Sequence, residues 1–218
     1  PANPSTPLRV PRVEGVPSLS REARGRVEGS KQERLEHLAW AVQRCRRCPL
    51  YRTRTHAVIS DGSPTARLLF VGEAPGRDED LAGVPFVGAA GQLLTKMIQA
   101  MGLRREEVYI CNVLKDRPPG NRTPLPEEIE ACLPFLQEQI AVVQPEVICA
   151  LGAVAAKALL GPHLAISKIR GQVCDYAGIP LVPTFHPAYL LRNPAMKRLA
   201  WSDLKQVKAL LNAPTIES

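Results

Sequence analysis

Several polar residues stand at the ends of apolar runs, where their side chains can do chemistry. Glu73 is the lone carboxylate of the turn Gly72–Gly76, which directly follows the apolar run Arg67–Val71. The two glycines of this turn permit a tight bend and a close approach of a ligand to the backbone. The turn lacks the Lys-Ser/Thr pair of a phosphate-binding loop and the third glycine of a dinucleotide fingerprint. Taken alone, it is more typical of an ordinary turn than of a site.

An amide and an imidazole accompany two further apolar runs. Asn112 lies inside the run Tyr109–Leu114, and His186 follows the run Leu181–Phe185. A buried Asn needs partners for its donors and its acceptor, so a structural hydrogen bond is the commoner explanation for Asn112. At the end of a strand, however, the amide can read the edge of a ligand. The imidazole of His186 can donate to a developing anion, and a histidine satisfied within the strand end is the alternative.

The segment Phe86–Gly91 places an aromatic residue before a run of small residues that leads into a predicted helix. Backbone N–H groups at such a helix start suit a phosphate. Phe86 offers a flat face on which a base can stack, although packing of this ring in the core is an equally good explanation. The segment Leu190–Arg192 carries two leucines and an arginine that can press on DNA.

Apolar periodicity predicts strands that alternate with helices. Core strands are predicted at Arg67–Val71, Val108–Val113, Val147–Leu151 and Leu181–Phe185, with a short edge strand at Val173–Tyr176. Helices are predicted from a Ser30/Glu33 capping box onward and at Gly91–Met101, Pro126–Val143, Ala153–Leu160 and Met196–Leu211. This alternation indicates an α/β fold, a three-layer α/β/α sandwich with a mainly parallel four-stranded central sheet. Ligands of such sheets bind beyond the carboxyl ends of the strands, where Gly72–Gly76, Asn112–Arg117 and His186–Pro187 are expected to meet.

The composition divides the chain into one domain and two tails. Residues 1–29 hold five prolines and five arginines against three glutamates, which predicts a disordered basic tail. We expect a single domain over residues 30–212 and a short C-terminal tail over residues 213–218. The formal charge of +7 favours a polyanionic partner such as nucleic acid.

The chain carries no apolar run of the ~18 residues that a membrane span needs and no apolar signal-peptide core. A cytoplasmic protein without a membrane partner, and a monomer, are therefore expected. In a reducing compartment the six cysteines are more readily reduced, buried or metal-binding than disulfide-bonded.

Five motifs together resemble one enzyme family. They are GEAPGRDED at 72–80, PFVGAAG at 85–91, NVLK at 112–115, RPPGNR at 117–122 and HPAYLL at 186–191. In their order and their places on the predicted strands they resemble the iron–sulfur uracil-DNA glycosylases, family 4 of the uracil-DNA glycosylase superfamily. The resemblance covers residues 31–211. It implies an enzyme of base-excision repair that flips deoxyuridine out of single- or double-stranded DNA and hydrolyses its N-glycosidic bond.

The resemblance also implies roles for individual residues. Phe86 stacks on the uracil beside Gly72, and Asn112 reads the N3–H and O4 groups, which cytosine presents in reversed polarity. Glu73 holds the attacking water, and His186 stabilises the charge that builds on uracil O2. Contacts with DNA are implied for Gly88, Gly91, Lys168, Arg170, Leu190 and Arg192, with Leu190 filling the gap left by the flipped base.

The family ligates a [4Fe–4S] cluster through four cysteines, and this chain departs from that set. Cys45, Cys48 and Cys132 match three of the positions, whereas Asp116 occupies the fourth. A carboxylate is a harder ligand than a thiolate, so three states are open: an Asp116-ligated [4Fe–4S] cluster, a three-iron cluster, or an incomplete site. The other three cysteines are predicted to be buried thiols; they are Cys111, Cys149 and Cys174.

The sequence disfavours three other functions. A covalently DNA-binding relative would need an inserted basic loop with a histidine nucleophile, and none occurs between Gly102 and Arg122. A non-catalytic DNA-binding module would not require Glu73, Asn112 and His186 together. A metal-dependent redox protein would need a flavin or nicotinamide site, which the motifs do not supply.

Overall fold

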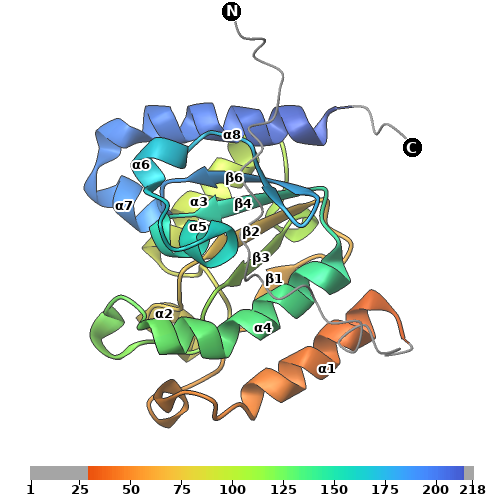
Figure 1. Cartoon of the computed structure of the whole chain (residues 1–218), viewed down its shortest axis with the longest axis vertical. Helices are drawn as coiled ribbons and strands as arrows, with labels where there is room; N and C mark the ends of the chain where they lie inside the picture. Colours follow the sequence, from red (N-terminus) through yellow and green to blue (C-terminus); the bar gives the residue numbers. More distant parts are fainter. Residues whose placement is uncertain (1–28, 214–218) are drawn as a thin grey trace, which may run out of the picture.

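Four of the predicted apolar segments pair side by side as the parallel centre of one sheet. The computed structural model describes residues 29–213, so nearly all of both predicted tails lies outside the described residues. The sheet has six strands in the order β1-β3-β2-β4-β6-β5 (Figure 1). The strands are β1 Ser60–Gly62, β2 Leu68–Gly72, β3 Tyr109–Asn112, β4 Val147–Leu151, β5 Cys174–Tyr176 and β6 Ile179–Thr184.

The α/β fold class is confirmed, and the sheet is wider than predicted. β3, β2, β4 and β6 pair in parallel, as the sequence indicated, and the expected edge strand is β5, which pairs antiparallel with β6. The sequence did not reveal β1, which pairs antiparallel with β3. Its three residues, Ser60–Gly62, are polar or glycine, so they carry no apolar alternation.

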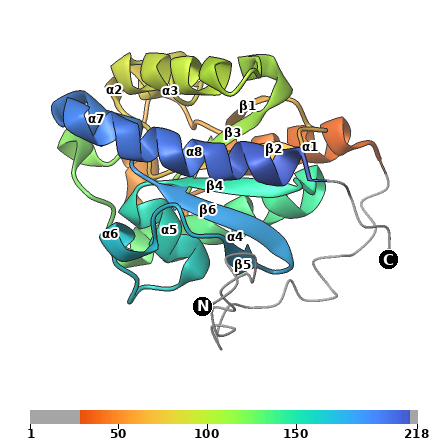
Figure 2. The same cartoon turned by 90° about the horizontal axis from the view of Figure 1, so that it is seen from above.

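Helices cover both faces of the sheet because the side chains of each strand alternate between the two faces. In β2, Leu69 and Val71 pack with α4 and α5 on one face, and Leu68 and Phe70 pack with α3 and α8 on the other. Figure 2 shows the sheet between these two helical layers. The α-helices are α1 Lys31–Gln43, α2 Arg77–Ala82, α3 Ala89–Ala100, α4 Pro126–Val143, α5 Ala153–Leu160, α6 Ile166–Ile169, α7 Pro187–Arg192 and α8 Lys197–Leu211. No helix within residues 29–213 is long and apolar enough to cross a membrane.

The long helices begin and end close to the predicted residues, whereas three short ones were missed. The capping box at the start of α1 is confirmed: the Glu33 N–H donates to Ser30 Oγ at 3.3 Å, and the Ser30 N–H donates to Glu33 Oε2 at 2.6 Å. The helices α2, α6 and α7 have only four to six residues each. A segment of that length is too short to display helical periodicity.

The C-terminal helix is fastened to the sheet by the buried carboxylate of Asp203. The hydroxyl of Thr184, at the end of β6, donates to Asp203 Oδ2 at 2.7 Å. Arg170 forms an ion pair with the same carboxylate and donates to the Leu199 carbonyl at 2.9 Å. These contacts tie the guanidinium of Arg170 to α8 (Lys197–Leu211), and its contact with DNA stays a prediction.

Replacing Asp203 with Ala should destabilise the fold. The change leaves the guanidinium of Arg170 and the hydroxyl of Thr184 without their buried acceptor. Loss of one partner from a buried ion pair costs about 3–5 kcal/mol. Urea unfolding followed by circular dichroism measures the difference, with Glu130→Ala as the control, since Glu130 is an exposed carboxylate. Equal midpoints for the two variants would contradict the anchoring role.

Candidate functional site

The carboxyl ends of the parallel strands open on a pocket of about 560 Å³. A volume of this size lies in the range of small-molecule sites. The four residues predicted to recognise and cleave the ligand all line it: Glu73 after β2, Phe86 before α3, Asn112 at the end of β3 and His186 after β6. The sheet thus brings together side chains that are separated by as many as 113 positions in the sequence, from 73 to 186.

Asn112 sits in this pocket with an unused acceptor. Asn112 is 2% exposed, and its Oδ1 has no hydrogen-bond partner within residues 29–213. An unpaired buried acceptor costs roughly 1–3 kcal/mol, which a ligand N–H would recover. This is the signature of a group that is kept ready for a ligand rather than one that serves the fold.

Gly72 makes room for the two recognition side chains. It pairs with Asn112 in the register of β2 and β3. A Cβ on Gly72 would clash with Asn112 Oδ1 and would lie 2.5 Å from Phe86 Cζ. The missing side chain therefore lets the amide and the ring meet above the end of β2.

Phe86 is held in a strained backbone conformation. Its φ is +54°, in the left-handed region that a bulky residue rarely adopts. Its carbonyl packs against Gly91, where any Cβ would clash with it. The ring of Phe86 is 5% exposed, and its centroid lies 5.6 Å from that of His186. Strain of this kind persists where the surrounding structure imposes it, often at a ligand site.

Glu79, which the sequence did not single out, organises the loop between these motifs. Its Oε1 accepts the N–H groups of Val87 at 3.0 Å and Gly88 at 2.9 Å, and its Oε2 accepts that of Gly76 at 3.1 Å. The phosphate contacts of Gly88 and Gly91 stay predictions, although both residues have partners within the chain. The N–H of Gly88 is donated to Glu79, and Gly91 is buried against Phe86.

Glu73 is a half-buried carboxylate without a cation beside it. It takes part in no ion pair within the described part of the chain. Burial raises the pKa of Glu73 above its usual value of 4.5. Its backbone carbonyl accepts the N–H of Leu114 at 3.0 Å, which fixes the start of the turn. Its carboxylate is thus held at the pocket wall and is free to orient a water molecule.

His186 is arranged to donate from Nε2. It caps α7, and its Nδ1 accepts the N–H of Ala188 at 3.1 Å. Because Nδ1 is the acceptor, the proton of the neutral ring resides on Nε2. Burial, aided by the charge of Arg192, lowers the pKa of His186 to about 4. Gly152, at φ +92°, leaves space for the imidazole, because a Cβ there would lie 3.0 Å from the Cβ of His186.

Two of the three α7 residues that were expected to face DNA are exposed, namely Leu191 and Arg192, whereas Leu190 is buried. Leu190 is 1% exposed and packs in the core, and its assignment to the gap left by a flipped base stays a prediction. The exposed neighbours are Leu191, at 43%, and Tyr189, at 36%. Arg192 is exposed and lines the pocket, as a DNA contact requires. Lys168 is exposed on α6 but does not line the pocket.

The loop after β3 forms one wall of the pocket. The sequence analysis assigned no role in the site to the residues of this loop that line it. Asn121 and Arg122 both line the pocket. The guanidinium of Arg122 donates to both oxygens of Glu128, at 2.6 and 2.8 Å, and Arg117 donates to Asn121 Oδ1 at 2.6 Å. These residues belong to the RPPGNR motif at 117–122, which was the feature of the sequence that could have indicated their place in the site.

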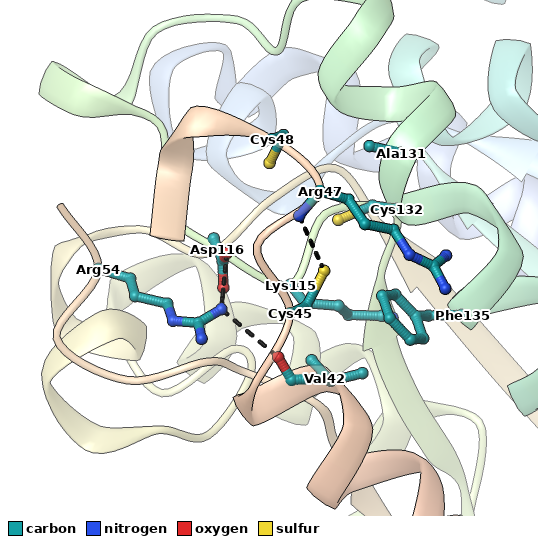
Figure 3. A pocket seen from close by; sticks show the side chains of 10 residues that line it. All are labelled: Val42, Cys45, Arg47, Cys48, Arg54, Lys115, Asp116, Ala131, Cys132 and Phe135. Atoms are coloured by element: carbon teal, nitrogen blue, oxygen red, sulfur yellow. Dashed lines mark hydrogen bonds and ion pairs between the residues drawn. The ribbon is translucent and has the colours of Figure 1, made fainter. Parts of the chain in front are cut away.

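A second, smaller cavity collects the four predicted cluster ligands. Cys45 and Cys48 come from the loop after α1, Asp116 from the loop after β3, and Cys132 from α4. Figure 3 shows the three sulfur atoms turned toward one space, with the Asp116 carboxylate at its edge. The remaining cysteines, Cys111, Cys149 and Cys174, are buried in the core, as predicted.

Three thiols and one carboxylate line this cavity, which are donor types that iron accepts. The described residues hold no group of three or more His, Cys, Asp or Glu side chains that suits a single metal ion. Both oxygens of Asp116 instead accept from Arg54 Nη1 at 2.9 Å. Arg54 also donates to the Val42 and Gln43 carbonyls at the end of α1. The fourth corner of the cavity is therefore closed by an ion pair.

Comparisons with known proteins agree with this geometry. The sequence model described as "Uracil DNA glycosylase superfamily" matches residues 59–205. The chain is 46% identical over 186 residues to a type-4 uracil-DNA glycosylase of Thermotoga maritima, covering 84% of this chain and 97% of that protein. It is 43% identical to a type-4 uracil-DNA glycosylase of Archaeoglobus fulgidus, covering 82% and 94%.

A more distant relative belongs to another type. The chain is 33% identical over 164 residues to a type-5 uracil-DNA glycosylase of Pyrobaculum aerophilum, covering 67% of this chain and 71% of that protein. The match to the superfamily spans more than half of the chain, and the type-4 relatives match over nearly their whole length. The chain therefore belongs to the uracil DNA glycosylase superfamily and, within it, to the type-4 uracil-DNA glycosylases.

Proposed function

We propose that this chain is a monofunctional uracil-DNA glycosylase of base-excision repair, with its catalytic domain in residues 30–212. The observation that carries the proposal is the unpaired Oδ1 of Asn112, buried in a pocket that Glu73, Phe86 and His186 also line. The names of the type-4 relatives support the same activity. The substrate is uracil-containing DNA, from which the target nucleotide must be extruded to reach the pocket.

Recognition of the base rests on the carboxamide of Asn112. Its Oδ1 accepts the N3–H of uracil, and its amide N–H donates to O4. Cytosine has an acceptor at N3 and a donor at C4, so it would leave both groups of Asn112 unpaired in a buried site. The ring of Phe86 gives the flat base a surface on which to stack.

Hydrolysis needs one group on each side of the glycosidic bond. As the bond between N1 and C1′ breaks, its electron pair moves onto the uracil ring, and His186 Nε2–H donates to the oxygen that becomes negative. The sugar develops oxocarbenium character, which the nearby carboxylate of Glu73 favours. Glu73 also orients the water whose oxygen bonds to C1′ and accepts the proton that this water loses. The uracil leaves as its anion and takes a proton from solvent, and an abasic site remains in the DNA. DNA beside the extruded nucleotide meets the α7 surface, where Arg192 and Leu191 are exposed.

The cysteine cavity is proposed to hold an iron–sulfur cluster through Cys45, Cys48 and Cys132. Such a cluster would cross-link the loop after α1 to α4, and the hydrolysis requires no electron from it. Asp116 is engaged by Arg54, which favours attachment at three corners over a complete set of four protein ligands. Iron content and visible absorbance of the purified protein test this assignment.

Excision itself is tested with a labelled oligonucleotide that contains one deoxyuridine, resolved on denaturing gels with and without alkali. Strand cleavage only after alkali is the expected result, because an abasic site breaks in base. An uncut strand would favour a non-catalytic DNA-binding protein. A slow band that survives denaturation would favour a covalent DNA-binding relative.

The variants Glu73→Ala and Asn112→Ala should each lower excision by roughly 100-fold, because each loses a group that acts in the transition state. The same gel assay measures the rates, and circular dichroism checks that the fold persists. Glu130→Ala, which removes an exposed carboxylate of α4, should keep the wild-type rate. Near-normal excision by both site variants would refute the assignment of the site.

The pH dependence of excision should be set by Glu73. The active forms are the Glu73 carboxylate and neutral His186. As the pH falls, Glu73 protonates first, above its usual pKa of 4.5, whereas His186 stays neutral down to a pH of about 4. Excision should therefore decline below neutrality with a midpoint above 4.5 and remain level on the alkaline side of that midpoint.

A variant of His186 distinguishes the effect of Glu73 on the pH dependence from that of His186. His186→Asn should lower the rate yet keep the same acid midpoint, since Glu73 remains in place. Rates measured from pH 4 upward decide the matter, with circular dichroism at each pH as the control for unfolding. A midpoint that disappears in His186→Asn would assign the acid decline to the imidazole instead.

Asp116→Cys should raise the iron content per chain and strengthen the visible iron–sulfur absorbance. A thiolate at this corner is a softer ligand for iron than a carboxylate and does not pair with Arg54 in the same way. Asp116→Ser is the matched control, because it removes the carboxylate without adding sulfur. Identical spectra for the two variants would mean that residue 116 does not lie at the cluster.

A further inference from the structure

Lys115 places a buried amino group between the cysteine cavity and the residue that is proposed to read the base. It is 1% exposed, and within residues 29–213 it is the one lysine or arginine classed as buried. Its Nζ donates to the backbone carbonyl of Asn112 at 2.6 Å and to Oε1 of Gln139 at 2.5 Å. The amino group of Lys115 therefore holds the backbone of Asn112, the residue that is proposed to read the base.

Gln139 is itself held on its other side. Its Nε2 donates to the Ile59 carbonyl at 3.1 Å and to the hydroxyl oxygen of Tyr109 at 3.0 Å. Gln139 is 0% exposed and belongs to α4, whereas Tyr109 begins β3. The chain of contacts thus fixes Lys115 between α4 and the strand that ends in Asn112. Buried polar networks in which each member is satisfied hold one arrangement of the groups rigidly.

The charge of Lys115 lacks a carboxylate partner. No ion pair in the described part of the chain includes it, although burying an ammonium group without a counter-charge is expensive. Lys115 lines the same cavity as Cys45, Cys48 and Cys132 (Figure 3). Thiolates gathered there around iron would supply the missing negative charge.

We propose that Lys115 is a positioning residue that connects the cysteine cavity to base recognition. Its amino group holds the Asn112 carbonyl on one side, and on the other it would face the negative charge of a cluster held by Cys45, Cys48 and Cys132. Fixing that carbonyl fixes the end of β3, and with it the direction in which the Asn112 amide faces the uracil. This inference rests on the proposed function, and it adds a residue that does not touch the substrate.

Lys115→Met tests the proposal, because Met keeps most of the volume of the side chain and removes its donors and charge. Two DNA ligands are compared: one with a 2′-fluorinated deoxyuridine, which resists hydrolysis, and one with a tetrahydrofuran abasic-site analogue. Affinity for the first should fall at least about tenfold, the loss expected for a hydrogen bond to a charged group. Affinity for the second should stay unchanged, because no base is read. Lys205→Met, which alters an exposed lysine of α8, should match the wild type with both ligands.

Iron content gives a readout that is independent of DNA. Removal of the counter-charge should lower the iron per chain in Lys115→Met and leave it unchanged in Lys205→Met. A merely structural role would instead weaken both DNA ligands alike, and that result, or wild-type values for uracil affinity and iron content, would overturn the proposal.

Gln139→Met keeps the test decisive if Lys115→Met does not fold. It leaves the lysine in place and removes its second acceptor, so it should reduce uracil affinity in the same direction and spare the abasic ligand. Equal effects on both ligands would overturn the proposal here too. Failure of the proposed function looks different, since the wild-type protein would then leave a deoxyuridine oligonucleotide uncut.

Discussion

The register between two neighbouring parallel strands is the constraint on which the rest of the site depends. It sets Gly72 of β2 opposite Asn112 of β3, at the edge of the sheet where both strands end. With no side chain at Gly72, the amide of Asn112 and the ring of Phe86 can occupy the same small volume. A shift of one residue in this pairing would turn Asn112 to the other face of the sheet, and its amide would no longer line the pocket. The strained φ of Phe86 is the local cost of that close approach.

Burial then gives the polar groups their chemical states. Water is partly excluded at the ends of the strands, so the ring of His186 stays neutral and Glu73 binds its proton more tightly than an exposed carboxyl group does. The N–H of Ala188 occupies Nδ1 of His186 and thereby directs the remaining proton toward the pocket. The same low polarity strengthens every hydrogen bond to a bound base and raises the penalty for a base that leaves Asn112 unpaired. In the proposed mechanism, selectivity and catalysis thus both depend on the burial of these groups.

Local sequence carried a large part of this outcome. Each central strand is a short run of apolar residues, and a run buried on both faces is typical of a parallel sheet. The order of strands and helices then allowed few topologies, and their carboxyl ends marked where Glu73, Asn112 and His186 would meet. The edge strand Ser60–Gly62 escaped notice because polar residues and glycine carry no apolar pattern, and it gains its place only by pairing with β3.

The sequence by itself determined the fold class and the edge of the sheet where Glu73, Asn112 and His186 gather, because these follow from periodicity and from the ends of the predicted strands, whereas the cysteine set was implied by the resemblance to a family. Only the tertiary structure decided which partner each polar side chain takes. Arg170 meets Asp203 and Arg54 meets Asp116 across 33 and 62 positions of sequence, so neither pair can be read from spacing. The burial of Leu190 was likewise decided when α7 docked against the core. Such contacts depend on how finished elements pack, and packing is a property of the whole chain.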